Sequence, residues 1–81
     1  MYSFIPYSTI REHMDEIVHS KVSVRARSPG QFLEMYARYG QNLPEAWALK
    51  RTNFIKRHMA SYKVHPTRRP LLALICWAYH P

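Results

Sequence analysis

The sequence predicts an all-α protein, a compact single domain over residues 1–81 with about four helices. Three observations lead to this prediction. Apolar residues recur at helical spacing in several segments, prolines and glycines divide the chain between those segments, and no Asn-Gly or Asp-Gly dipeptide marks a hairpin. We expect the helices at roughly 8–20, 29–39, 43–63 and 70–79.

The first helix is expected to begin after Pro6, where Thr9 and Glu12 fit a capping box. Apolar side chains then recur on one face, at Ile10, Met14, Ile17 and Val18. The stretch 22–27 alternates apolar and polar residues but has no obvious strand partner. We therefore interpret it as a connecting segment.

The second helix has the clearest boundary signals in the chain. Ser28 is a good N-cap, Pro29 suits the first helical position, and Gln31 completes a capping box. Gly40 stands where a left-handed residue ends a helix. These signals predict about three helical turns.

The third helix is predicted to be the longest. Asn42 can cap it, and Pro44 and Glu45 suit its first turn. No breaker follows until His65, which precedes a proline and therefore avoids the helical region.

The fourth predicted helix begins near Pro70 and is apolar all round from Leu71 to Ala78. A helix with no polar face is typical of the centre of a fold, so we expect it to be buried. A buried strand is the alternative, and the leucine and alanine content favours the helix.

The charge is divided unevenly along the chain. Residues 1–45 contain five basic and five acidic side chains, whereas residues 46–81 contain seven basic side chains and no acid. The net charge of +7 therefore comes entirely from the second half. Such a positive field attracts phosphate or an acidic protein surface, although excess charge can also serve solubility alone.

Six basic residues of the second half are predicted to contact the nucleic acid or acidic partner: Lys50, Lys56, Arg57, Lys63, Arg68 and Arg69. Arg68 and Arg69 stand beside a predicted helix start, in an arrangement like a phosphate clamp. Arg25 and Arg27 precede the second helix in the same way and form a secondary basic site.

The third helix has an apolar side at about 100° per residue. It consists of Trp47, Phe54, Ile55, Met59 and Tyr62. Lys50, Asn53 and Arg57 are expected on the far side, with Lys56 and Lys63 at one flank.

Arg51 and His58 project into that apolar side, which leaves two interpretations. In the structural one, Arg51 stacks on Trp47 or Tyr62 and either extends its charged end to solvent or pairs with an acid of the first helix; the candidate acids are Glu12, Asp15 and Glu16. In the functional one, an aromatic–basic face is open to a ligand; it consists of Trp47, Arg51, Phe54, His58 and Tyr62.

Several chemistries have no support in the sequence. There is no phosphate-binding glycine loop and no nucleophile elbow, so we expect no enzyme and no cofactor. Cys76 lies in the most apolar segment and is expected to be an inert core residue. Cys76 and His80 are four apart, but no second pair has the ligand spacing of a metal site.

The sequence also bears on location and partners. No apolar run reaches the ~18–20 residues of a membrane span, and the first residues do not resemble a signal peptide. A single cysteine suits a reducing, cytoplasmic compartment. A chain this short buries only a small hydrophobic core, so a homodimer, which would bury more surface, is also compatible with the sequence.

Two functions remain compatible with the sequence. The first is a small, basic, non-enzymatic regulator that binds nucleic acid through its C-terminal half. The second is an interaction protein, an adaptor or inhibitor of the kind that phages and plasmids encode, which docks on an acidic surface of a partner protein. No membrane partner is expected.

Overall fold

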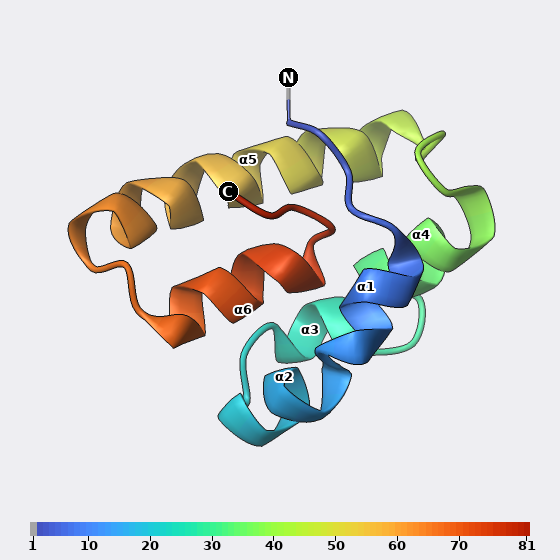
Figure 1. Ribbon diagram of the computed structural model, residues 1–81. Helices are drawn as coiled ribbons and strands as arrows, with labels where there is room; N and C mark the ends of the chain where they lie inside the picture. The colour runs from blue at the N-terminus through green and yellow to red at the C-terminus, as the bar shows by residue number, and fades with distance from the viewer. Residues whose placement is uncertain (1) are drawn as a thin grey trace.

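The computed structural model describes residues 2–81, and all regular elements in this range are helices (Figure 1). There are six of them: α1 (Tyr7–Glu12), α2 (Met14–Ser20), α3 (Val24–Arg27), α4 (Phe32–Tyr39), α5 (Glu45–Val64) and α6 (Arg68–Cys76). The prediction of an all-α fold is confirmed, but six helices replace the expected four.

The single helix expected over 8–20 is broken at His13. Its imidazole Nδ1 lies 2.9 Å from the Thr9 carbonyl oxygen, which the His13 backbone N–H would take in an unbroken α-helix. That N–H bonds to the Ile10 oxygen instead, at 3.1 Å. The side chain thus competes with the backbone, and α1 and α2 are separate helices.

The segment 22–27 is not merely a connection, because Val24–Arg27 forms the short helix α3. Two residues with left-handed backbones, Lys21 (φ 59°) and Ser23 (φ 51°), turn the chain before it. Val22 and Ala26 are buried and anchor the segment to the core. A helix of four residues is too short to show a periodicity in the sequence.

The predicted start of the second helix is wrong by three residues. Helix α4 begins at Phe32, and the Ser28 hydroxyl donates backwards to the Val24 oxygen instead of capping α4. The Glu34 carboxylate accepts the Gly30 N–H at 3.0 Å. Gly40 ends the helix with the expected positive φ of 59°, but its ψ of −137° lies outside the left-handed helical region.

Helix α5 begins at Glu45 with Pro44 as N-cap, so Asn42 does not cap it. Helix α6 ends at Cys76, three residues before the predicted end. There, Ala78 has φ 63°, and the Tyr79 N–H reaches back to the Leu74 oxygen at 3.1 Å. Glycine is usual at such a helix end; because alanine occupies it here, the sequence carries no stop signal.

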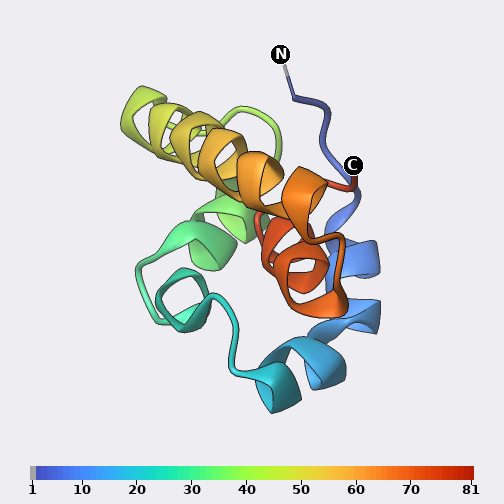
Figure 2. The ribbon, with the colours of Figure 1, turned by 90° about the vertical axis from the view of Figure 1, so that its left-hand side faces the viewer.

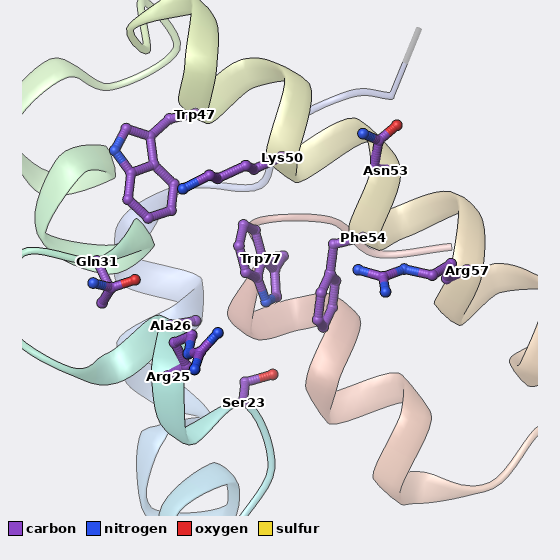
Figure 3. A pocket seen from close by; sticks show the side chains of 10 residues that line it. All are labelled: Ser23, Arg25, Ala26, Gln31, Trp47, Lys50, Asn53, Phe54, Arg57 and Trp77. Carbon is purple, nitrogen blue, oxygen red and sulfur yellow. The ribbon is translucent and has the colours of Figure 1, made fainter.

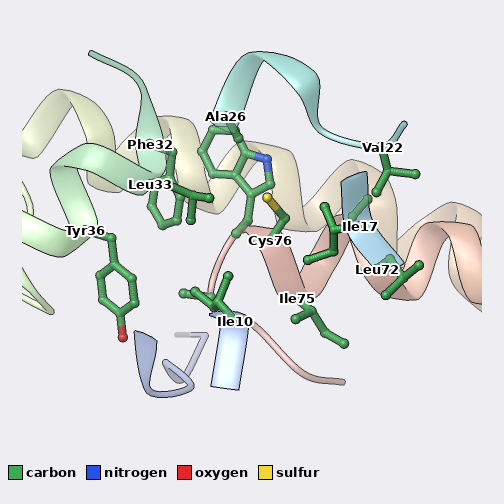
Figure 4. Close-up of a cluster of buried hydrophobic side chains, with 13 residues drawn as sticks. Ile10, Ile17, Val22, Ala26, Phe32, Leu33, Tyr36, Leu72, Ile75 and Cys76 are labelled. Carbon is green, nitrogen blue, oxygen red and sulfur yellow. The ribbon is translucent and has the colours of Figure 1, made fainter. Parts of the chain in front are cut away.

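Helix α6 runs between α5 and the α1–α2 pair (Figures 1 and 2). Its side chains meet those of the N-terminal helices in the core, shown in Figure 4. Leu72, Leu74, Ile75 and Cys76 are fully buried.

Aromatic rings continue the core from α4 toward α5. Trp77 lies between Phe32 and Phe54, with ring centroids 4.5 and 4.4 Å away. Phe54 stacks in turn on His58 at 3.8 Å. This column fixes α5 against the turn that follows α6, and it leaves a hollow on one side, between α5 and α3.

Candidate functional site

A hollow with a volume of about 690 Å³ lies between α3 and α5 (Figure 3). It is lined by Ser23, Arg25, Ala26, Gln31, Trp47, Lys50, Asn53, Phe54, Arg57 and Trp77. We call it the basic pocket, because three of these residues are cations. All five acids of the chain lie within residues 2–81, and none of them lines it.

Helix α5 supplies one wall of the basic pocket. Trp47, Lys50, Phe54 and Arg57 are spaced by three and four residues, so they share one side of the helix. The Lys50 ammonium lies 4.6 Å from the centroid of the Trp47 ring, a cation–π contact.

Lys50, Asn53 and Arg57 were expected on the far side of α5 from its apolar residues, and all three are exposed, although each also lines the basic pocket together with Trp47 and Phe54. The covered side of α5 is centred on Arg51 and Ile55, its two buried residues. At about 100° per residue, Asn53 lies opposite these two buried residues, and Lys50 and Arg57 lie between Asn53 and the half-buried Trp47 and Phe54.

Helix α3 and the turn before it supply the opposite wall. Arg25 is exposed and lines the basic pocket. Arg27, its predicted companion, turns away: its Nε donates to the Val22 oxygen at 3.2 Å, and it lines a separate hollow beside α4. The structure thus divides the predicted secondary basic site.

Trp77 closes the inner end of the basic pocket. The residue is 8% exposed, and neighbouring rings cover both faces of its indole. Two buried side-chain polar atoms within residues 2–81 lack a hydrogen-bond partner: Trp77 Nε1 and Ser23 Oγ. Ser23 has the thiol of Cys76 beside it, which is only a weak hydrogen-bonding group. Both residues with unpaired atoms therefore belong to this pocket.

Arg51 lies inside the fold, as the structural interpretation expects, but with other partners. It is 4% exposed and donates to four backbone oxygens: Trp77 (2.8 Å), Ala78 (3.0 Å), Ser3 (2.7 Å) and Tyr2 (3.2 Å).

The expected acid partner and the expected aromatic partner of Arg51 were both wrong. No acid contacts it within the described chain, and its guanidinium lies 3.8 Å from the ring centroid of Phe4 instead of over Trp47 or Tyr62. Burial lowers the pKa of Arg51 to about 10, which leaves it protonated at neutral pH. Arg51 is a structural cation, removed from any ligand face.

His58 stands outside the basic pocket, in an adjoining smaller hollow of about 340 Å³. That hollow also contains Lys21 and Arg69, and it shares Ser23 and Phe54 with the basic pocket. The predicted aromatic–basic face is therefore only partly assembled: Trp47 and Phe54 line the basic pocket, His58 the smaller hollow, and Tyr62 neither.

The predicted phosphate clamp is bound to the protein itself. Two nitrogens of Arg68 donate to the two carboxylate oxygens of Glu16, at 2.5 and 2.6 Å. This hydrogen-bonded pair lowers the pKa of Glu16 and raises the pKa of Arg68. Arg69 donates to the Ser20 oxygen at 2.6 Å.

Lys56 and Lys63 are exposed on another side of α5 and line neither hollow. Of the six basic residues predicted to bind together, the structure brings only Lys50 and Arg57 into the basic pocket. Arg25, from the secondary site, joins them.

Five lining residues were not predicted as site residues: Ser23, Ala26, Gln31, Asn53 and Trp77. The spacing of Asn53 from Lys50 and Arg57 carried a usable signal, since all three share a helix side. Ser23 and Gln31 had no such signal, because they come from turns whose position depends on the packing of α3 and α4.

Two other kinds of feature are absent from the described residues. No group of three or more metal-ligating side chains comes together in residues 2–81. Within the same range, no helix is both long and apolar enough to cross a membrane. No protein-family model, curated protein or solved structure shows significant similarity to the chain.

Proposed function

We propose that this chain is a non-enzymatic regulator that binds nucleic acid through the basic pocket, in a reducing, cytoplasmic compartment. One observation carries the proposal: Arg25, Lys50 and Arg57 converge from two helices on one concavity that no acid of residues 2–81 lines. Cations gathered in this way without counter-ions hold phosphate, and counter-ion release from the nucleic acid drives the binding.

The distribution of the acids supports this choice of site. Glu16 pairs with Arg68, and Glu34 lies 3.8 Å from Arg38, both outside the basic pocket. The pocket cations have no such partner in the described chain, so their field is available to a ligand. Polar Asn53 and Gln31 add neutral hydrogen-bonding groups along the rim.

The experiment is a titration of fluorescein-labelled oligonucleotides with the protein, followed by fluorescence anisotropy at several salt concentrations. The test variant is Lys50→Glu/Arg57→Glu. The matched control is Lys56→Glu/Lys63→Glu, which makes the same charge change on the same helix but outside the basic pocket.

We expect the wild type to bind with an affinity that falls steeply with salt. The test variant should lose most of the binding and flatten the log–log salt slope by about 1.4–1.8, since each phosphate contact contributes about 0.7 for single strands or 0.9 for duplex. The control should bind nearly as wild type does. Equal losses in the two variants would contradict a localised site.

Failure of the wild type to bind any oligonucleotide at low salt would refute the proposed function. The acidic surface of a partner protein would then be the ligand to seek. The same pair of variants would serve in a pull-down from nuclease-treated lysate.

A further inference from the structure

We infer that the nucleic acid bound here is single-stranded and that one unstacked base enters the basic pocket beside Trp47. The inference rests on the proposed function and narrows it. Its basis is the shape of the cavity, the faces that its aromatic rings leave free, and the unpaired donor at its inner end.

The basic pocket continues into the smaller hollow, because the two share Ser23 and Phe54. Together they form what we call the basic groove, with α5 as one wall and the segment 21–25 as the other. Its basic side chains are Lys21, Arg25, Lys50, Arg57, His58 and Arg69. No acid within residues 2–81 lines either hollow.

The length of the groove matches a short strand. From Trp47 to His58, α5 rises about 17 Å at 1.5 Å per residue. A stacked strand advances about 3.4 Å per nucleotide, so roughly five phosphates pass the groove.

A duplex fits this arrangement poorly. Duplex readers place an exposed helix in a major groove about 12 Å wide, with its polar side chains directed outward to the bases. The basic residues of α5 are divided instead: Lys50 and Arg57 border the hollow opposite Arg25, while Lys56 and Lys63 lie elsewhere on the helix. Cations on two facing walls surround one strand better than they meet a convex duplex.

The aromatic residues of the pocket differ in what they offer a base. Rings cover both faces of Phe54 and of Trp77, so these two present only edges. Trp47 is half-buried, and the group over its face is the side chain of the exposed Lys50. A base that stacks on Trp47 would displace this ammonium, which then becomes available to a phosphate.

The unpaired indole N–H of Trp77 gives a reason for the base to enter deeply. A buried donor without an acceptor is uncommon in folded proteins and carries a free-energy cost. The indole nitrogen can only donate. The Nε1 atom itself is closed to solvent, so an oxygen of the incoming nucleotide can accept its N–H only once the side chains around it move apart; Figure 3 shows Trp77 in the wall between Trp47 and Phe54.

The test compares a short labelled DNA strand of mixed sequence, the RNA strand of the same sequence, and the DNA duplex. We expect at least one of the two strands to bind about tenfold or more tightly than the duplex, a difference of about 1.4 kcal/mol. For that strand, the salt slope should reach about −3.5, from five permanently charged contacts at about −0.7 each.

Trp47→Ala should weaken strand binding about 5- to 150-fold, which corresponds to the 1–3 kcal/mol of one stacked base. Its salt slope should stay unchanged, because stacking releases no counter-ion. Trp47→Phe keeps an aromatic face and should recover most of the affinity, which separates stacking from misfolding. Trp77→Phe keeps a ring between its neighbours and removes the N–H, so it should also weaken binding.

The outcomes separate the two proposals. A duplex that binds as tightly as both strands, with the same dependence on Lys50 and Arg57, would overturn this inference and leave the proposed function standing. Unchanged strand affinity in folded Trp47→Ala would overturn the placement of a base beside Trp47. Absence of binding to strands and duplex alike would refute the proposed function itself.

Discussion

Replacing Arg51 with methionine should destabilise the fold by about 2–5 kcal/mol, although no acid is lost as a partner. The guanidinium connects three parts of the chain: α5, the extended residues 2–3, and the turn 77–78. Methionine keeps a long apolar stem in the same space and removes every donor. The variant therefore isolates the hydrogen bonds from the packing.

The magnitude follows from the partners that are left behind. The buried Trp77 oxygen loses its only side-chain donor, and an unsatisfied buried acceptor costs about 1–3 kcal/mol. The Ala78 oxygen keeps the Ile5 N–H at 2.9 Å, so its loss is smaller. The cation–π contact with Phe4 adds about 0.5–2 kcal/mol. The oxygens of residues 2 and 3 are part-buried, and water can replace the guanidinium there.

The assay is urea unfolding followed by circular dichroism, with thermal melting in parallel. A chain of this length has a total stability of about 4–12 kcal/mol, so the expected loss is a large fraction of it. The melting temperature should fall by about 8–40 °C, at 4–8 °C per kcal/mol. Arg57→Met is the matched control on the same helix; its side chain is exposed, and its stability should stay within about 0.5 kcal/mol of wild type.

Arg51→Lys should be intermediate. It keeps the charge, but its ammonium has only three donors on one atom, so it cannot replace all four hydrogen bonds that the planar guanidinium makes. An Arg51→Met variant within about 0.5 kcal/mol of wild type, the range of an ordinary surface substitution, would refute the idea that this cation connects the two ends of the chain to α5.

Three further predictions concern stability and reactivity. The Arg68 hydrogen bonds lower the folded-state pKa of Glu16, so their stabilisation is complete above the usual pKa of 4.5 and is lost as the pH falls through the lower folded-state pKa. As the pH is lowered, the melting temperature of the wild type should therefore fall more than that of Glu16→Gln, and parallel curves would contradict a stabilising Glu16–Arg68 pair. Burial raises the pKa of the Cys76 thiol to about 11, so iodoacetamide at mildly alkaline pH should modify the folded protein far more slowly than the urea-unfolded one, and equal rates measured by mass spectrometry would show an accessible thiol. Leu74→Ala, at a fully buried position, should cost about 2–5 kcal/mol in urea unfolding, and a near-neutral result would place α6 at the surface.

Helix content could be predicted because it depends on neighbours in the chain. Apolar residues at helical spacing and the breaker at His65–Pro66 indicated α5 within two residues at each end. The errors arose where a side chain or an unusual residue altered a local pattern. The His13 imidazole took a helical carbonyl oxygen, and Ala78 occupied a position that usually requires glycine.

The charge asymmetry was also visible in the sequence, because it is a matter of counting. The sequence did not show which cations act together, because that depends on where the helices lie in the fold. Arg68 pairs with Glu16 at a separation of 52 residues, while Arg25 faces Lys50 and Arg57 across the basic pocket. A one-dimensional charge pattern cannot distinguish a cation paired within the fold from one that is free to bind.

The sequence by itself thus determined that this protein is helical and that its positive charge is concentrated in the second half, because periodicity, breakers and charge are local properties. The tertiary structure alone decided the role of Arg51 and the make-up of the basic pocket. The partners of Arg51 are backbone oxygens 26 to 49 residues away. Every residue carries such an oxygen, so no residue type marks the right ones; only the packing of α5 against both ends of the chain selects them.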